Sequence, residues 1–286
     1  MIRLFPVVEF YITNVCNLTC RGCNRFNNYN FKGHQRWADH AEAYEAWSKR
    51  LDLPRICIIG GEPTLNPDLE SWVMNIRRLW PDAIDIFVQT NGTYQRPEHL
   101  TFRKKYDVGF ALSLHDPSTA EELKAKWKNV TSGVIEAYTF HQSAVIKKDE
   151  HYILHNNDPQ QAFNSCDMKH DHTMYQGKLY KCPAMSNLPD FDQQFGLHLD
   201  DRQRKLLYSY TPLSADCSED ELQEFAKTRD TPISQCEFCP SNLKWHTALG
   251  EHRENLPKPN FSPQIQESDL IEFRYSTNQI QVDKQR

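Results

Sequence analysis

The sequence lacks long hydrophobic runs, and no uninterrupted apolar stretch in its 286 residues approaches the length of a membrane-spanning helix. Residues 1–9 carry one positive charge and are interrupted by Glu9, so they lack the apolar core of a signal peptide. No run rich in lysine and arginine occurs, and the net charge is −5, whereas a nucleic-acid enzyme would more often show a basic face. These absences predict a cytoplasmic protein with neither a membrane nor a nucleic acid as partner.

Cysteine, by contrast, is plentiful, with nine residues in the chain. In a reducing compartment this number favours metal or redox chemistry over disulfides. Cys16, Cys20 and Cys23 lie in one short loop directly after the apolar, strand-like residues 7–12. Iron–sulfur clusters are ordinarily held by four thiolates, so a loop with three would leave one iron of a four-iron cluster open. A structural zinc loop or three unrelated thiols are the alternatives.

The pattern Cys-x3-Cys-x2-Cys after a first strand, with Gly60-Gly61-Glu62-Pro63 after a second, resembles the radical S-adenosylmethionine (SAM) superfamily. The resemblance implies a [4Fe-4S] cluster on the three cysteines, with SAM chelating the open iron. It also implies reductive cleavage of SAM to a 5′-deoxyadenosyl radical, which abstracts a hydrogen atom from the substrate. An external electron donor such as flavodoxin or ferredoxin is then expected. Gly22 departs from the family, which usually has an aromatic residue there.

Strand-like and helix-like segments alternate in the first half of the chain, which is typical of parallel βα units. Strands are predicted at 7–13, 55–59, 84–90 and 108–114, and helices at 39–50, 67–80, 97–106 and 118–140. Residues 144–147 and 152–155 are predicted to form either a hairpin or one long strand. Together with the resemblance, this predicts an α/β fold: a shortened partial (β/α) TIM-like barrel of about five to six strands, followed by a small Cys-rich α+β auxiliary-cluster domain.

Candidate binding residues fall at the carboxyl ends of the predicted strands, where chemistry gathers in such folds. The resemblance implies that the segment with Gly60, Gly61 and Glu62 lies along the SAM amino group, since glycine permits close backbone approach and an acidic group suits an ammonium. Asn91 and Ser113 are expected to bond the SAM carboxylate or ribose. Turn and cap chemistry is the alternative for both residues.

Three residues are candidates for a catalytic role. His115 and Lys147 lie on or after late strands and could accept the proton that a two-electron oxidation releases, although solvated surface is the alternative for each. Cys217 lies in a polar stretch and could be a hydrogen-atom donor, a cluster ligand or an idle thiol.

A second set of cysteines follows in the later half of the chain: Cys166, Cys182, Cys236 and Cys239. The set resembles the twitch extension of radical SAM enzymes, the shortened form of the SPASM domain, which holds one auxiliary [4Fe-4S] cluster. Four thiols could equally fill a tetrahedral zinc site. The predicted division is a radical SAM barrel at 1–158, an auxiliary-cluster domain at 159–250 and a polar arm at 251–286 that is either packed on the surface or disordered.

The combined expectation is a radical SAM oxidoreductase that dehydrogenates a small polar metabolite, such as a sugar or aminocyclitol, with help from the auxiliary cluster. A peptide-modifying maturase is the main alternative, and it is disfavoured because no leader-peptide domain precedes the first strand. The GTP-cyclising branch is disfavoured because its members end in Gly-Gly, whereas this chain ends in Gln285-Arg286. A non-catalytic zinc-binding protein would leave residues 60–63 unexplained.

Overall fold

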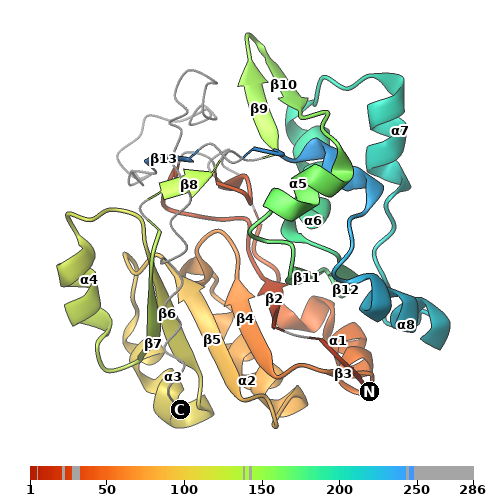
Figure 1. The fold of residues 1–286 in the computed structure, drawn as a ribbon. Coiled ribbons are helices and arrows are strands. Elements are labelled where there is room, and N and C mark those ends of the chain that lie inside the picture. The colour runs from red at the N-terminus through yellow and green to blue at the C-terminus, as the bar shows by residue number, and fades with distance from the viewer. Residues whose placement is uncertain are drawn as a thin grey trace.

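The computed structural model describes residues 1–4, 6–20, 23–27, 33–137, 139–141, 144–242 and 245–247, with the backbone alone at 139–141 and 245–247 (Figure 1). The predicted arm at 251–286 lies outside the described residues. No helix in the described ranges is both long and apolar enough to cross a membrane.

A seven-stranded sheet forms the centre of the fold, with the strand order β12-β11-β2-β4-β5-β6-β7. All neighbouring strands are parallel except β12, which pairs antiparallel with β11. The strands of this sheet are β2 (Val7–Tyr11), β4 (Arg55–Ile59), β5 (Asp85–Thr90), β6 (Gly109–Leu114), β7 (Thr131–Glu136), β11 (Asp171–Tyr175) and β12 (Lys178–Tyr180). This parallel-dominated α/β sheet, left open as a partial barrel, confirms the predicted fold class.

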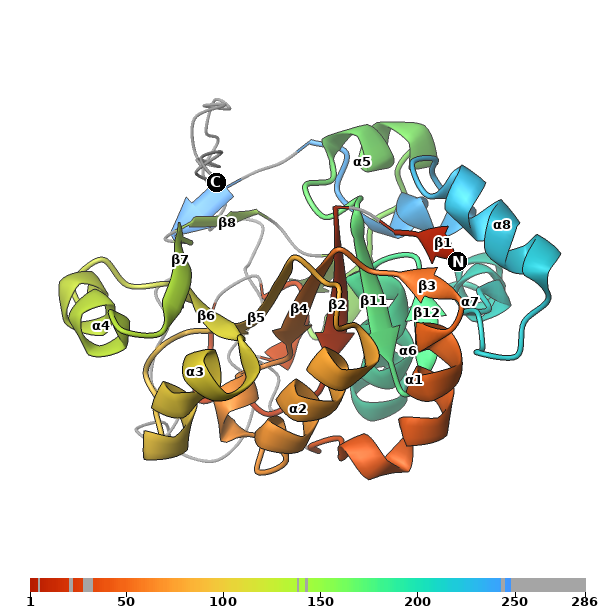
Figure 2. The ribbon, with the colours of Figure 1, turned by 90° about the horizontal axis from the view of Figure 1, so that it is seen from below.

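Helices connect the parallel strands and cover one face of the sheet, and Figure 2 shows α1, α2 and α3 along that face. These helices are α1 (Ala41–Ser48), α2 (Leu69–Leu79), α3 (Phe102–Tyr106) and α4 (Ala120–Trp127), with the short 3-10 helices η2 (Trp37–Asp39), η3 (Pro63–Leu65) and η4 (Pro97–Thr101). Their apolar sides pack on the sheet to form the larger hydrophobic core, which includes Trp47, Trp72 and Trp127. The burial of these large side chains contributes most of the driving force for this layer.

Alternation along the strands gives the two faces of the sheet different chemistry. In β2, Val8 and Phe10 belong to the larger core, whereas Glu9 and Tyr11 point to the opposite, inner face, because successive side chains of a strand alternate. The same alternation places Gln89 of β5 and Asp171 of β11 on the inner face, where both line a cavity together with Glu9. The inner face of the sheet is therefore partly polar, as expected of a wall that meets ligands.

The prediction of a helix at 118–140 is wrong beyond residue 127. The helix α4 ends at Trp127, and β7 follows as the fifth parallel strand of the barrel. The physical reason is local: the segment contains Thr131, Gly133, Val134 and Ile135, and β-branched residues and glycine disfavour a helix. The strand lies at the edge of the sheet, and Val134 and Ile135 are exposed there.

The segment after β7 forms a hairpin, β9 (Val145–Lys148) and β10 (His151–Leu154), which confirms the hairpin alternative. In the described residues the two hairpin strands form a sheet of their own, with an isolated bridge from Tyr152 to Leu197, and β7 rather than the hairpin supplies the fifth barrel strand. The small strands β1 (Ile2–Arg3) and β3 (Leu51–Asp52) pair in parallel, and β8 (Thr139–His141) pairs antiparallel with β13 (Trp245–Thr247).

The later half of the chain packs around a second hydrophobic core, which includes Phe26, Met185, Phe191 and Phe238. The helices of this half are α5 (Pro159–Ser165), α6 (Pro183–Phe195), α7 (Asp201–Ser209), α8 (Glu219–Thr228) and the 3-10 helix η5 (Ser234–Phe238). Of these, α8 packs on the larger core instead, through Leu222 and Phe225. Because β11 hydrogen-bonds in parallel with β2, the later half also extends the main sheet. The division at residue 158 stays a prediction, but the two halves share one sheet.

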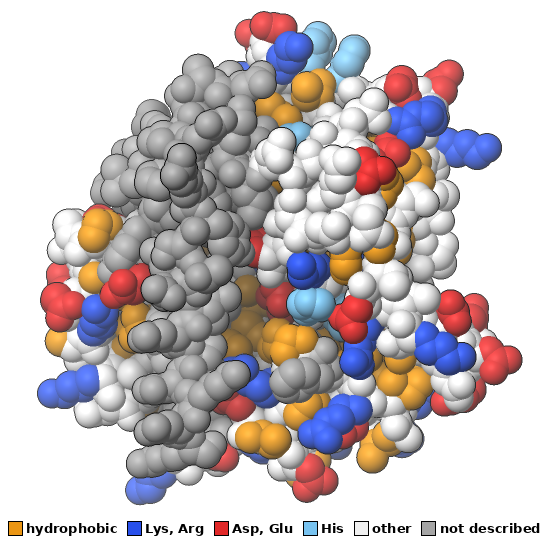
Figure 3. All heavy atoms as spheres, in the orientation of Figure 1, with side chains coloured by type: hydrophobic (Ala, Val, Ile, Leu, Met, Phe, Trp, Pro, Cys, Tyr) orange, Lys and Arg blue, Asp and Glu red, His pale blue; other side chains and the backbone are white. Residues whose placement is uncertain are grey.

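The surface carries charges of both signs. Figure 3 shows Lys and Arg interspersed with Asp and Glu over the described part of one face. Lys105 pairs with Glu70 at 2.6 Å, and Arg78 pairs with Glu45 at 2.9 Å; all four side chains are well exposed. Exposed pairs of this kind contribute little to stability, so the folded state depends mainly on the two cores.

Candidate active site

The three cysteines of the first motif lie in a loop that leaves the carboxyl end of β2. Cys20 is buried, and Cys16 and Cys23 are half-buried. The loop turns tightly, since the Cys23 amide donates to the Cys20 carbonyl (3.4 Å) and the Phe26 amide donates to the Cys23 carbonyl (3.0 Å). Phe26 is fully buried against Phe191 of α6, with ring centroids 5.4 Å apart. The loop is thus fixed to the sheet at one end and to the second core at the other.

Two glycines at the end of β4 hold the start of this loop against the sheet. A Cβ atom on Gly60 would lie 2.6 Å from the Thr13 carbonyl oxygen, and one on Gly61 would lie 2.4 Å from the Val15 carbonyl oxygen. The Gly61 amide donates to Thr13 (2.8 Å) and the Glu62 amide donates to Val15 (2.7 Å). Only glycine allows the two backbones to approach this closely. The glycines therefore position the cysteine loop, and this role does not depend on a contact with SAM.

The Glu62 carboxylate is fully buried and bound by protein groups. Its Oε1 accepts hydrogen bonds from the Thr64 amide (3.1 Å), the Thr64 hydroxyl (2.6 Å) and the Thr90 hydroxyl (2.6 Å), and its Oε2 accepts one from the Asn91 amide (2.7 Å). Burial raises the pKa of Glu62, and these hydrogen bonds oppose the rise. The side chain thus joins the ends of β4 and β5. Its contact with a ligand stays a prediction.

Asn91 links the end of β5 to the cysteine loop. Its side chain donates to the Asn17 side-chain oxygen (2.9 Å) and accepts from the Thr93 amide (3.0 Å) and hydroxyl (2.6 Å). Gly92 follows with a φ of +76°, which an L-residue rarely adopts. The turn chemistry considered as the alternative for Asn91 is therefore present, and a ligand bond from its side chain stays a prediction.

A cavity of about 210 Å³ opens at the carboxyl ends of these strands. It brings together most of the residues that the sequence predicted for the site: Cys16, Cys20, Cys23, Gly60, Gly61, Asn91, Ser113 and His115. His115 Nδ1 lies 3.3 Å from the Ala137 carbonyl oxygen, and burial lowers the pKa of His115. A neutral imidazole at this position can accept or donate a hydrogen bond, but its proton-accepting role stays a prediction.

Three of the residues predicted for this site do not line the cavity: Glu62, described above, and the catalytic candidates Lys147 and Cys217. Lys147 lies on the β9 strand of the hairpin. Cys217 lies beside the end of α1, where Arg50 Nη1 donates to the Cys217 carbonyl (2.7 Å) and approaches its Sγ (3.5 Å). Burial is the main cause of the raised pKa of Cys217, so its thiol form is favoured. The structure gives neither residue a contact with the cavity, and a catalytic role for either stays a prediction.

Sequence reasoning missed a charged cluster in the cavity wall. Arg25 Nη2 lies 2.5 Å from Glu9 Oε2, and both side chains are almost fully buried. Asp171, the first residue of β11, lines the same cavity. Glu9 could have been noticed as a charge within the apolar run of residues 7–12. Arg25 and Asp171 carried no signal, because the packing of the cysteine loop brings Arg25 to this place and the pairing of β11 with β2 brings Asp171.

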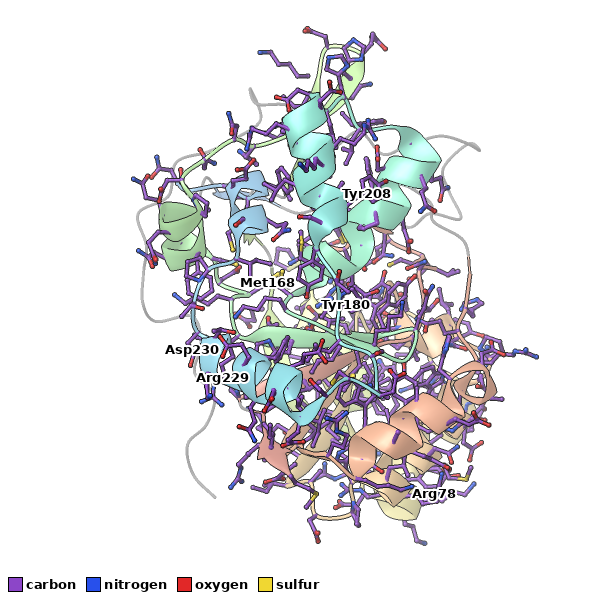
Figure 4. All side chains as sticks on the ribbon, turned by 90° about the vertical axis from the view of Figure 1, so that its right-hand side faces the viewer. Arg78, Met168, Tyr180, Tyr208, Arg229 and Asp230 are labelled. Atoms are coloured by element: carbon purple, nitrogen blue, oxygen red, sulfur yellow. The ribbon has the colours of Figure 1, made fainter. Side chains whose placement is uncertain are left out.

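The side chains between the sheet and the later half close the cavity on another side. Met168 lies just before β11 and lines the cavity. Figure 4 shows Met168 and Tyr180 between the sheet and the helices of the second core, with Arg78 of α2 far from them. The cavity therefore lies at the boundary of the two halves of the chain, and both contribute to its wall.

The second set of cysteines also comes together. Cys166 follows α5, Cys182 precedes α6, and Cys236 and Cys239 flank the end of η5, where the Cys239 amide donates to the Cys236 carbonyl (3.0 Å). Burial raises the pKa of Cys166 to about 12 and that of Cys182 to about 11, and neighbouring thiols add to both shifts. Four thiols from distant segments therefore share one place in the fold.

Both sets consist of cysteines only. Thiolates bind iron–sulfur clusters and zinc alike. The donor chemistry therefore fits the cluster that family resemblance implies at the first set, and it fits a cluster or zinc at the second. Within the described ranges, no group of three His, Cys, Asp or Glu side chains lies close enough to hold a single metal ion.

Among protein families, the model of the radical SAM superfamily matches residues 10–153. Among curated relatives, a GTP 3′,8-cyclase of Nautilia profundicola is 27% identical over 139 residues, which is 47% of this chain and 42% of that protein. A probable GTP 3′,8-cyclase of Pyrococcus abyssi is 32% identical over 90 residues, 31% of this chain and 28% of that protein. The chain thus spans less than half the length of these relatives.

Among solved structures, BtrN in complex with AdoMet and 2-DOIA aligns with a TM-score of 0.46 and 16% identity, covering 85% of this chain and 100% of that chain. Streptococcus suis SuiB bound to S-adenosylmethionine aligns with a TM-score of 0.34 and 18% identity, covering 44% of this chain and 28% of that chain.

Proposed function

The chain belongs to the radical SAM superfamily, and we propose that it oxidises a small polar metabolite, such as a sugar or an aminocyclitol, by removing two hydrogens. Family membership makes the protein an enzyme that uses a [4Fe-4S] cluster and SAM. The reaction outcome and the substrate class are the proposal. The observation that carries it is the single cavity where the cysteine loop meets a polar inner wall of the sheet.

Cys16, Cys20 and Cys23 are the proposed ligands of the cluster that binds SAM. When bound, the cluster and SAM together supply one-electron cleavage to a 5′-deoxyadenosyl radical that abstracts a hydrogen atom. The chain's own residues fix the loop: Gly60 and Gly61 hold its start and Phe26 its end. Such rigid anchoring suits a reactive group that must be kept in place and away from water.

Cys166, Cys182, Cys236 and Cys239 are the proposed ligands of an auxiliary [4Fe-4S] cluster. An oxidation that removes two hydrogens must pass on a second electron, and a cluster with four protein ligands is suited to electron transfer rather than substrate binding. What supports the assignment is that four half-buried thiols from three segments lie near enough to influence one another's pKa. Zinc at the same thiols would make the site structural and would leave the second electron without this acceptor.

The polar wall of the cavity supports a hydrophilic substrate. Glu9, Gln89, Ser113 and Asp171 come from four strands and all line the same space. An apolar substrate would remove water from these polar groups and offer them no hydrogen bond in return, which is costly in a buried site. A polyhydroxylated substrate offers hydrogen-bond partners to each of them.

Nucleotide cyclisation is the competing function, because the curated relatives are named GTP 3′,8-cyclases. The charge of the wall disfavours it here. Glu9 and Asp171 line the cavity beside one guanidinium, Arg25, and that guanidinium already pairs with Glu9. The cluster therefore offers a triphosphate no uncompensated positive charge, which disfavours its binding.

The test is an anaerobic assay with SAM and dithionite against a panel of hydroxylated amines, sugars, GTP and peptides. We expect a product that lacks two hydrogens from a sugar or aminocyclitol, formed in proportion to 5′-deoxyadenosine. Deuterium placed on the oxidised carbon should appear in the 5′-deoxyadenosine. A cyclised nucleotide or a modified peptide as the product would refute the proposal.

A matched pair of cysteine variants accompanies that assay. Cys20→Ala is expected to abolish 5′-deoxyadenosine formation, because a cluster with one ligand missing cannot be held in place. Cys217→Ala removes a thiol that does not line the cavity and is expected to retain it. Full turnover by the Cys20 variant would contradict the ligand assignment.

A further inference from the structure

A buried charged cluster lies in the cavity wall, built from three separate segments. Glu9 comes from the middle of β2, Arg25 from the end of the cysteine loop, and Asp171 from the start of β11. Neighbouring strand positions bring the first and last together, because Thr173 pairs with Glu9 and its hydroxyl donates to Glu9 Oε2 (3.3 Å). The cluster is thus a product of the fold rather than of a sequence motif.

Arg25 is held rigidly and has a donor to spare. Its Nη2 pairs with Glu9 at 2.5 Å, and its guanidinium carbon lies 5.6 Å from the centroid of the Tyr11 ring. Its other terminal nitrogen, Nη1, is buried and has no hydrogen-bond partner in the described part of the chain. Leaving a buried donor unpaired costs free energy, so such groups usually meet a ligand or water.

Asp171 lacks a cation of its own in the described part of the chain, whereas Arg25 lacks an acceptor for Nη1. Among the groups that shift its pKa, Arg25 is the one cation, and that guanidinium already pairs with Glu9. Burial raises the pKa of Asp171 to about 8, Glu9 adds to the rise, Arg25 opposes it, and Asp167 adds a smaller increase. Two carboxylates and one guanidinium leave one negative charge uncompensated, and the protein alone relieves it by holding a proton on Asp171.

We propose that Glu9, Arg25 and Asp171 form a substrate subsite for a hydroxylated primary amine, with the ammonium beside the two carboxylates and a hydroxyl oxygen accepting from Arg25 Nη1. The ammonium replaces the proton on Asp171 and completes the charge balance. The hydroxyl satisfies the spare donor of Arg25. This inference rests on the proposed function, since it names the substrate class within the same cavity.

The subsite discriminates among ligands by charge. A neutral sugar can reach the donor of Arg25 but brings no positive charge to Asp171, which then keeps its proton. A phosphate ester would bring an anion to a cluster whose one cation, Arg25, is already paired with Glu9. SAM also carries an ammonium, so it is the one other source of this chemistry in the cavity, and the test must separate the two.

The experiment is calorimetric titration of the reconstituted holoenzyme with glucosamine as probe and glucose as its neutral counterpart, with SAM present and no reductant. We expect saturable binding of glucosamine, about 10- to 100-fold tighter than that of glucose, because hydrogen bonds to charged groups are worth that much. Binding to the wild type at pH 7 should release a proton, seen as a heat that varies with the ionisation enthalpy of the buffer. Equal affinity for the two sugars, or no binding of glucosamine, would overturn the proposal.

Variants locate the effect. Asp171→Asn and Glu9→Gln are expected to lose about 10-fold or more in glucosamine affinity. Asp85→Asn is the matched control, since Asp85 is also the first residue of a strand but pairs with Arg55 (3.1 Å) and does not line the cavity. Thermal melting checks that each variant is folded, and if Asp171→Asn is not, Glu9→Gln and the proton release of the wild type still decide the question. An equal loss in Asp85→Asn would contradict the subsite.

A separate measurement distinguishes this inference from its premise. If the cluster bound the ammonium of SAM, Asp171→Asn would lose SAM affinity and 5′-deoxyadenosine formation, and the substrate subsite would be wrong. Preserved SAM cleavage with lost glucosamine binding supports it. If instead glucosamine binds as expected but no substrate is ever dehydrogenated, the proposed reaction fails and the subsite stands.

Discussion

Replacing Gly61 by alanine should dislodge the cysteine loop. A Cβ atom at this position would lie 2.4 Å from the Val15 carbonyl oxygen and 2.9 Å from Cys16 Cβ, whereas ordinary contacts begin at 3.4 Å. The loop would therefore have to move by about 1 Å at the Val15 carbonyl. Neither neighbour is the flexible end of a long side chain, so the backbone itself must shift.

The cost can be worked from the contacts that this shift breaks. The Gly61 amide bonds Thr13 at 2.8 Å and the Glu62 amide bonds Val15 at 2.7 Å. Each such hydrogen bond contributes about 1 kcal/mol, and overpacking adds about 1–3 kcal/mol. A loss of roughly 3–5 kcal/mol follows from the two bonds and the overpacking together, which corresponds to a fall in Tm of about 6–20 °C for a chain of this size.

The assay measures melting temperature and iron content after anaerobic reconstitution. Gly61→Ala is expected to lower both, because Cys16 lies against the substituted position. Gly133→Ala is the matched control: a Cβ there meets nothing within 4 Å, and the change should stay within about 0.5 kcal/mol. Wild-type melting and full iron content in Gly61→Ala would refute the clamp between β4 and the cysteine loop.

Two further predictions concern pH and the second cysteine set. The folded chain keeps a proton on Asp171, with a pKa of about 8, that the unfolded chain releases near its ordinary 3.8, so the unfolding free energy should fall as pH rises between these values. Urea unfolding at about pH 6 and pH 9 should show this fall, and Asp171→Asn should flatten it; a fall of the same size in the variant would count against the assignment. Cys239→Ala should keep 5′-deoxyadenosine formation but uncouple it from product, and full coupling would exclude an electron-transfer role for the second set. Chelation should lower the Tm of the second core, since metal-binding free energy is folding free energy in a small metal domain, and an unchanged melting profile would argue against a metal there.

The strands of the barrel were predictable because each is a short apolar run bounded by turn residues. The predicted segments 55–59 and 84–90 match β4 and β5 within one residue, and 108–114 matches β6 as closely. Functional residues gather at the carboxyl ends of parallel strands in such folds. The sequence alone therefore predicted that the cysteines, the glycines and Ser113 lie near one another, and all of them line one cavity.

The failures have physical causes. The helix predicted at 118–140 overlooked the β-branched residues that form β7. This strand, and not the later hairpin, is the fifth parallel strand of the barrel. The parallel pairing of β11 with β2 joins segments more than 160 residues apart in the sequence, so no local sequence pattern predicts it. Asp171 and Arg25 reach the cavity only through that pairing and the packing of the cysteine loop.

Side-chain roles within the motifs were also beyond the sequence. An acidic residue after two glycines suggested a ligand contact, yet the Glu62 carboxylate is bound by Thr64, Thr90 and Asn91. Hydrogen bonds between segments 28 residues apart decide that outcome, and composition does not reveal them. The sequence thus identified the place of the chemistry better than the role of each residue in it.

The most direct test of the central claim is the iron and zinc content of the anaerobically reconstituted protein, measured together with 5′-deoxyadenosine formed from SAM and dithionite. The account predicts about eight irons per chain, no zinc and 5′-deoxyadenosine in the wild type, and about four irons without 5′-deoxyadenosine in Cys20→Ala. Protein without iron that does not cleave SAM would contradict it.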